Sequence, residues 1–145
     1  MKLIATSAHS TGATDPNVLE IANTEDPRTV SLDGVTRIDL NFPKFTDGRA
    51  YSQAFLLRRR LGFTGEIRAT GDVLIDQLVQ MERTGFDVAV LREDQHLEFA
   101  QAQFDRYRGF YQGDAVTVRP RFVTHPQLVP PAPAKRDFLQ TGAAI

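Results

Sequence analysis

The strongest constraint on the fold is a strand pattern followed by a helix pattern, which occurs three times in the middle of the chain. Short runs of alternating apolar residues are typical of strands, whereas apolar residues three and four positions apart are typical of helices. Glycine follows the first two helix patterns, at Gly62 and Gly85, as is common just past a helix end. Strand and helix units joined by short connections require a parallel sheet with right-handed crossovers. We therefore predict an α/β fold in which three consecutive βα units form a small parallel sheet with helices on one main face.

The predicted elements alternate along the chain, and further short strands are expected outside the three units. In order, the units are strand 36–42 with helix 48–61, strand 66–70 with helix 73–84, and strand 86–91 with helix 95–111. Residues 18–22 predict a short additional N-terminal strand, 29–32 a second extended segment, and 116–118 one more strand.

A single α/β domain is predicted over residues 17–118. Residues 1–16 are small and polar without periodicity, which predicts a flexible leader. Residues 119–145 hold five of the eight prolines and predict a Pro-rich tail, with a short terminal anchor at 135–139. This tail is basic, which suits an acidic partner surface.

The composition excludes several classes of function. A formal net charge of -1 predicts no attraction to nucleic acid or to an anionic membrane. No apolar run is long enough to span a bilayer, and the first ten residues do not form a signal peptide, so we expect a cytoplasmic protein. The absence of cysteine excludes thiol chemistry and cysteine-held clusters.

The sequence also lacks the motifs that are typical of common catalytic sites. It contains no glycine-rich phosphate or dinucleotide motif, no G-x-S-x-G and no H-E-x-x-H. His9, His96 and His125 lie far apart, so no metal site is predicted. We predict no cofactor.

One face of the predicted sheet is unusually polar. If the helices cover the face with Ile38, Leu40, Phe42, Ile67, Val88 and Val90, the other face carries Arg37, Asp39, Asn41, Glu66, Arg68, Thr70 and Asp87. Interior parallel sheets are normally apolar on both faces. We therefore expect the N-terminal strands or a partner to cover the polar face, with a pair such as Asp39 and Arg68 reducing the cost of burial.

Charged and polar side chains follow each of the three predicted strands. They are Lys44, Thr46, Asp47 and Arg49 after the first strand, Asp72 after the second, and Arg92, Glu93 and Asp94 after the third. Because ligands collect at the carboxyl ends of parallel strands, these residues form a candidate anion-binding or partner-binding site. The alternative is that the aspartates only cap helices and that the cations, together with Arg58, Arg59 and Arg60, face water.

Several of these segments resemble a known bacterial family. The F-P-K-F-x-D-G-R motif at 42–49, the G-D-V-L-x-D-Q-L motif at 71–78, Gly85-Phe86-Asp87 and residues 91–95 are similar to those of a domain-of-unknown-function family, DUF 934, commonly labelled an oxidoreductase involved in sulfite reduction. The resemblance covers about 42–111. It implies a small cytoplasmic protein of assimilatory sulfate reduction, whose partner would be sulfite reductase or another sulfur-assimilation protein. It implies no known reaction, cofactor or catalytic residue, and the chain offers no motif that would hold an electron carrier.

Three interpretations follow. The first is an accessory or interaction protein of assimilatory sulfite reduction, with no assigned reaction. The second is a small enzyme or sensor that binds an oxyanion through Lys44, Thr46, Arg49 and Arg92. The third is a homo-oligomer whose polar faces pair.

Overall fold

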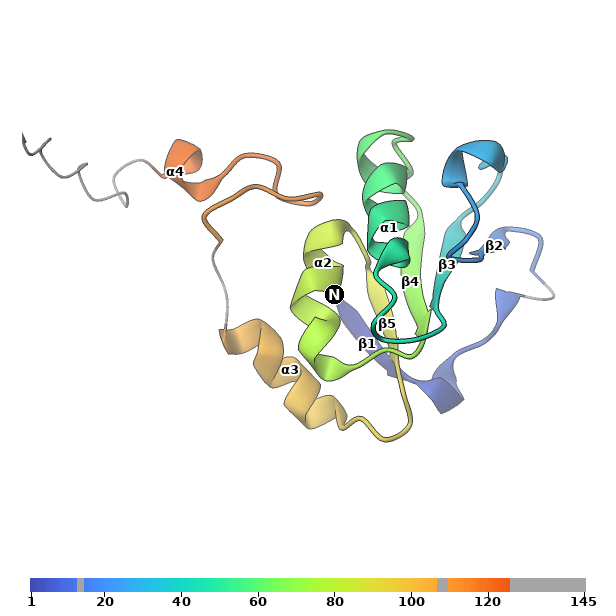
Figure 1. Cartoon of the computed structure of the whole chain (residues 1–145), viewed down its shortest axis with the longest axis horizontal. Coiled ribbons are helices and arrows are strands. Elements are labelled where there is room, and N and C mark those ends of the chain that lie inside the picture. The colour runs from blue at the N-terminus through green and yellow to red at the C-terminus, as the bar shows by residue number, and fades with distance from the viewer. Residues whose placement is uncertain (13–14, 107–109, 126–145) are drawn as a thin grey trace, which may run out of the picture.

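Five parallel strands form one sheet in the computed structural model, which describes residues 1–12, 15–106 and 110–125 (Figure 1). The strand order is β1-β5-β4-β3-β2. The strands are β1 Lys2–Ala5, β2 Val18–Ile21, β3 Arg37–Phe42, β4 Glu66–Gly71 and β5 Val88–Leu91. The predicted α/β class and the parallel sheet are confirmed.

Three helices connect or follow the last three strands, and α1 and α2 lie in front of the sheet in Figure 1. They are α1 Arg49–Arg59, α2 Leu78–Thr84 and α3 Leu97–Arg106. The second predicted helix is shorter than expected, because a 3-10 turn at Ile75–Gln77 precedes α2. A short helix α4, Arg121–Thr124, lies in the C-terminal segment away from the sheet (Figure 1).

The core lies between the sheet and this helix layer. Leu40 and Ile67 of the sheet and Leu57 and Leu78 of the helices have no exposed surface. Burial of such a side chain contributes roughly 1.5–3 kcal/mol relative to an exposed one. Apolar packing therefore holds the helices on this face.

The prediction that Val88 and Val90 face the helices is wrong. Ala89 and Leu91 belong to the helix-side core, whereas Val88 and Val90 point to the opposite face and are only 2% and 3% exposed. Every residue of β5 is buried, so alternation could not show which residues face which side. Asp87 precedes β5 and lies toward the helix layer and not on the polar face, because its carboxylate pairs with Arg58 of α1.

The prediction for Arg58 is also wrong. Its side chain is 14% exposed and donates to the carbonyl oxygens of Phe63, Gly65 and Gly85 at 2.8, 2.7 and 2.9 Å. It also forms an ion pair with Asp87. Arg58 therefore ties α1 to the connections that precede β4 and β5, whereas Arg59 and Arg60 are exposed as expected.

The connection between β1 and β2 crosses the face opposite the helices. From β2 to β5 the chain moves strand by strand in one direction, but from β1 to β2 it returns across the whole sheet. Right-handed crossovers in opposite directions lie on opposite faces. Accordingly, the Arg37 guanidinium donates to the Ser10 carbonyl oxygen at 2.7 Å, and the Gly12 N–H donates to Glu20 Oε1 at 3.2 Å.

The segment expected to be a flexible leader thus contains a strand and part of this crossover. β1 pairs with β5 along its whole length, and the Met1 amino group contacts Glu82 Oε1 at 2.7 Å. Four residues at a sheet edge are too few for a visible periodicity, which explains why the sequence predicted a leader and not the strand β1. The expected cover by N-terminal strands is wrong, because β1 and β2 are edge strands of the sheet itself, and the crossover between them covers part of the polar face instead.

Two other expected strands are absent from the described residues. The segment 29–32 begins inside a 3-10 turn at Pro27–Thr29 and forms no strand, and 116–118 is irregular. Asp114 instead anchors the C-terminal segment by an ion pair with Arg83 at 3.1 Å. The expected anchor at 135–139 lies outside the described residues. Among the described helices, none has the length and apolar character needed to cross a membrane.

Candidate functional site

The loops after β4 and β5 are joined by a chain of ion pairs at the carboxyl edge of the sheet. Arg92 Nη1 lies 2.6 Å from Asp72 Oδ1, and Arg92 Nε lies 2.6 Å from Asp94 Oδ1. The other oxygen of Asp72 accepts a hydrogen bond from the Phe45 N–H at 2.8 Å, which adds the loop after β3. The structure therefore brings Asp72, Arg92 and Asp94 together, as their positions in the sequence predicted.

These contacts lower the pKa of both carboxyl groups. The hydrogen bond from Arg92 lowers the pKa of Asp94 to about 2. For Asp72 the largest cause of the lowered pKa is the Phe45 N–H, followed by Arg92. Asp72 thus ties two loops together and does not cap the following helix, which was the alternative expectation.

A second ion pair lies at the start of α1. Arg49 Nη2 is 2.6 Å from Asp47 Oδ2, and Asn23 Nδ2 donates to the same oxygen at 2.7 Å. The hydrogen bond from Arg49 lowers the pKa of Asp47 to about 2. Asp47 Oδ1 also accepts the Arg49 N–H at 3.2 Å, so this aspartate does satisfy a helix-start amide.

The remaining predicted site residues are Lys44, Thr46 and Glu93. All three are exposed, and within the described part of the chain their side chains form no hydrogen bond or ion pair. The predicted site is therefore divided into the Asp72–Arg92–Asp94 chain, the Asp47–Arg49 pair and three separate surface side chains. Both arginines already have carboxylate partners, so an anion would compete with them.

A small pocket lies at the carboxyl ends of the neighbouring strands β1 and β5, whose following connections leave the sheet on opposite faces. After β1 the chain passes to the crossover, whereas after the neighbouring β5 it passes to α3. Ligands in open α/β sheets bind in such crevices. This pocket has a volume of about 330 Å³, and Thr6, Ser7, Arg92, Glu93 and His96 are among its lining residues. Sequence reasoning missed Thr6 and Ser7 because it placed them in a leader.

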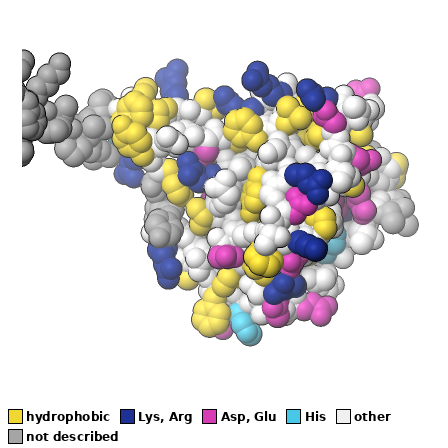
Figure 2. Space-filling model, in the orientation of Figure 1, with side chains coloured by type: hydrophobic (Ala, Val, Ile, Leu, Met, Phe, Trp, Pro, Cys, Tyr) yellow, Lys and Arg dark blue, Asp and Glu magenta, His cyan; other side chains and the backbone are white. Residues whose placement is uncertain are grey.

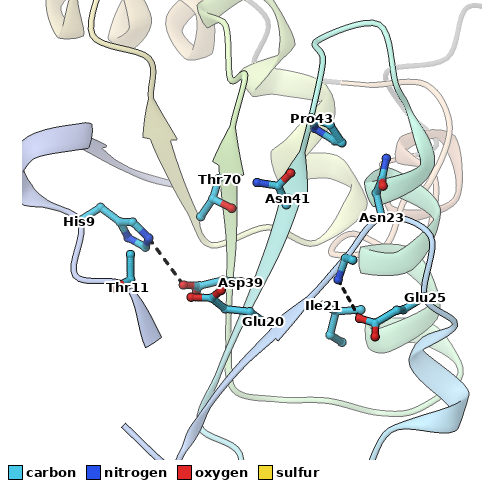
Figure 3. A pocket seen from close by; sticks show the side chains of 11 residues that line it. His9, Thr11, Glu20, Ile21, Asn23, Glu25, Asp39, Asn41, Pro43 and Thr70 are labelled. Carbon is cyan, nitrogen blue, oxygen red and sulfur yellow. Dashed lines mark hydrogen bonds and ion pairs between the residues drawn. The ribbon is translucent and has the colours of Figure 1, made fainter. Parts of the chain in front are cut away.

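A larger pocket of about 590 Å³ lies on the polar face, between the crossover and the carboxyl halves of β2, β3 and β4 (Figure 3). None of the predicted site residues lines it. Its lining residues are His9, Thr11, Glu20, Ile21, Ala22, Asn23, Glu25, Asp39, Asn41, Pro43 and Thr70. The signal that could have indicated it is the polarity of β3 and β4 on one face.

Asp39 and His9 form one wall of this pocket. Asp39 is 3% exposed and accepts two hydrogen bonds from Arg37, at 2.9 and 2.8 Å. His9 Nε2 lies 3.7 Å from Asp39 Oδ2, and His9 Nδ1 lies 3.4 Å from Arg68 Nη1. His9 therefore lies between a buried carboxylate and a guanidinium and fastens the crossover to the sheet.

The predicted pair between Asp39 and Arg68 is wrong. Asp39 pairs with Arg37 two residues earlier on the same strand, and Arg68 pairs with Glu66 in the same way. Neighbours two residues apart on one strand share a face, so these pairs satisfy the polar face within each strand. Among the described residues, no group of histidine and acidic side chains is arranged to hold a metal ion.

Comparison with known proteins identifies the family. A family model described as a bacterial protein of unknown function (DUF934) matches residues 18–122, which includes β2 to β5 and the helix layer. No curated protein matches the chain, and no solved structure matches it. The chain belongs to the DUF934 family.

Proposed function

We propose that this protein is an accessory interaction protein of assimilatory sulfite reduction in the cytoplasm. The partner we propose is sulfite reductase or another sulfur-assimilation protein, as the family resemblance implies. The observation that supports an interaction role best is a set of exposed apolar side chains at the carboxyl edge of the sheet, where α1 and α3 begin. We assign no reaction, cofactor or metal to this chain.

Three apolar side chains, Phe45, Leu97 and Phe99, define what we call the apolar edge. They are 48%, 47% and 55% exposed. All three lie on the loops and the helix start that follow β3 and β5, and large exposed apolar side chains at one edge of a protein are typical of interaction sites. Figure 2 shows that hydrophobic side chains are interspersed with Lys, Arg, Asp and Glu side chains over the face of the molecule that carries the helices.

Hydrogen bonds hold the segments that carry the apolar edge in fixed positions. Gln77 Nε2 donates to the Phe45 carbonyl oxygen at 2.7 Å, and the Ile75 N–H donates to Gln95 Oε1 at 3.2 Å. The Asp72–Arg92–Asp94 chain joins the same loops. A surface that is already ordered before binding loses less conformational entropy when a partner docks.

The proposal is tested by sulfur-dependent growth of a bacterium that lacks the gene. We expect slow growth on sulfate or sulfite and normal growth on cysteine, with rescue by the wild-type gene. The double substitution Leu97→Ser and Phe99→Ser should fail to rescue and should abolish co-purification with sulfite reductase. Arg59→Ser and Arg60→Ser together serve as the matched control, because both side chains are exposed at the other end of α1.

Normal growth of the deletion strain on sulfate and sulfite would contradict the proposed pathway. Rescue by the Leu97→Ser and Phe99→Ser variant would contradict the apolar edge as the interface while leaving the pathway open to a different surface.

The second candidate is an oxyanion-binding enzyme or sensor at the carboxyl ends of the strands. The exposed, unpaired ammonium group of Lys44 favours it within the described residues. The ion pairs of Arg49 and Arg92 disfavour it, because an incoming anion would have to displace Asp47, Asp72 or Asp94. Calorimetry with sulfite and sulfate tests it, and Lys44→Ala and Arg49→Ala should each remove any binding observed.

A further inference from the structure

We propose that the pocket between the crossover and the polar sheet face is a binding site for a small organic cation that carries a primary amine, with Glu20 as its counter-ion. This site lies on the opposite face of the sheet from the helix layer and is independent of the apolar edge. It therefore adds a small-molecule ligand to the proposed interaction role.

The size and position of the pocket suit a small ligand. Its volume of about 590 Å³ lies within the range of roughly 300–1,000 Å³ that is typical of small-molecule sites. It lies beside the carboxyl halves of three parallel strands, and the crossover closes one side through His9 and Thr11 (Figure 3). The exposed residues Ala22 and Pro43 line the pocket and can contact the carbon skeleton of a ligand.

Two carboxylates lie side by side in the pocket, and the described residues supply a strong cation partner to only one of them. Glu20 and Asp39 are direct neighbours on β2 and β3, so their side chains share one face. Asp39 is satisfied by both hydrogen bonds from Arg37. Glu20 is exposed and accepts only the Gly12 N–H, and within the described part of the chain no lysine or arginine pairs with it.

Like charges on directly opposite residues of two strands destabilise a sheet. An amine that binds beside Glu20 would remove this repulsion and would form a charge-assisted hydrogen bond. Glu25, on the other side of the pocket, accepts the Ala22 N–H at 2.9 Å through one carboxylate oxygen and adds further negative charge.

The neutral polar groups of the pocket also favour a ligand rich in hydrogen-bond donors. Asn23 is 8% exposed, and its amide nitrogen donates to Asp47, so its oxygen remains an acceptor. The Thr70 hydroxyl donates to the Leu40 carbonyl oxygen at 3.3 Å, which leaves its lone pairs for a ligand. Asn41 is exposed and is labelled at the upper side of the pocket in Figure 3.

The same groups argue against the other ligand classes. An oxyanion such as sulfite would lie next to Glu20 and Glu25, which have no cation partner among the described residues, and would be repelled. A metal ion is not favoured either, because the described residues contain no cluster of ligands suited to one.

The test is a two-dimensional NMR titration of the full chain with putrescine as the probe. We expect saturable shifts of the backbone amides of Glu20, Asn41 and Thr70, and weaker binding as salt is added. Glu20→Gln should lower the affinity about tenfold or more, because it removes the charge but keeps an acceptor for the Gly12 N–H. Asn41→Ala should lower it about threefold.

Three controls make the outcome decisive. Asp33→Asn removes one negative charge from an exposed loop outside the pocket and should leave the affinity unchanged. Butanediol, the uncharged counterpart of putrescine, and sulfite should cause no saturable shifts at these amides. The proposal is overturned if putrescine gives no saturable shifts, if butanediol binds equally well, or if Glu20→Gln and Asp33→Asn have the same effect.

Discussion

The face of the sheet under the helices and the face under the N-terminal crossover are covered in different ways. Under the helices, Ile38, Leu40 and Ile67 pack against apolar helix residues and have no exposed surface. Under the crossover, Asp39 and Arg68 contact His9, and Glu20 binds the Gly12 N–H. The first face resembles the interior of an ordinary domain, whereas the second combines buried charge with a pocket.

The two faces of this small sheet therefore suit different roles, the helix-covered face stabilising the fold and the crossover face being suited to binding. Apolar packing has no direction and excludes water, so it stabilises the fold without creating a site. Charged side chains on the second face need partners, and the crossover supplies only some of them. The face that contributes least apolar packing is therefore the face best suited to recognise a ligand.

The largest effect is expected from a cavity in the helix-covered face. Leu40→Ala should lower the free energy of unfolding by about 2–5 kcal/mol, because Leu40 is fully buried among helix and sheet residues. Urea denaturation measures this change, with Phe99→Ala as the exposed control that should have little effect. If Leu40→Ala lowered the free energy of unfolding as little as Phe99→Ala does, apolar packing would not distinguish the helix-covered face from the other face.

Arg58 is the polar exception on the helix side. Arg58→Ala should cost about 2–3 kcal/mol, since it removes donors from three carbonyl oxygens and the partner of Asp87. The neighbouring Arg59→Ala is the matched control and should change the unfolding free energy by less than about 0.5 kcal/mol. Equal effects of the two substitutions would mean that the Arg58 contacts contribute nothing.

A smaller effect is expected on the crossover face. Asp39→Asn should cost about 1–2 kcal/mol, because it weakens the pairing with Arg37 and the contact with His9. Hydrogen exchange of the Gly12 amide should also become faster, since the crossover loses part of its attachment. Unchanged exchange at Gly12 would show that the crossover is held without Asp39.

The fold was predictable where local signals agreed. The glycines at 62 and 85 and the change from alternating to helical periodicity located three βα units, and a parallel sheet followed from their order. β1 was missed because four residues at an edge carry no clear pattern, and the orientation of β5 was wrong because all of its residues are apolar.

The candidate site was only partly predictable for a different reason. The rule for strand ends correctly brought Asp72, Arg92 and Asp94 together, but it could not show that they satisfy one another. The pocket depends on His9 and Thr11 of the crossover meeting Glu20 and Asp39 of two strands. Contacts between segments so far apart in the sequence are fixed by topology, which local periodicity does not reveal.

The smallest effect on stability is expected from the ion pairs at the carboxyl edge of the sheet, which lies between the two faces. The pKa values of Asp47 and Asp94 are lowered from 3.8 to about 2 by hydrogen bonds from Arg49 and Arg92. A carboxyl group with a lower pKa in the folded state stabilises the fold above its unfolded pKa, and this contribution is lost as the pH falls from about 4 to about 2. The melting temperature should therefore decrease over that range, and Asp47→Asn should make the decrease shallower.

Added salt separates these exposed pairs from the buried contacts of both faces. Arg49 and Arg92 are exposed, so their pairs are screened by salt, and the acid-induced decrease should shrink at high ionic strength. Thermal melts of the wild type and of Asp47→Asn between pH 2 and 5 at low and high salt measure this. If Asp47→Asn left the pH profile unchanged at low salt, the pair with Arg49 would contribute nothing to folding, and the stability of this edge would have to come from packing alone.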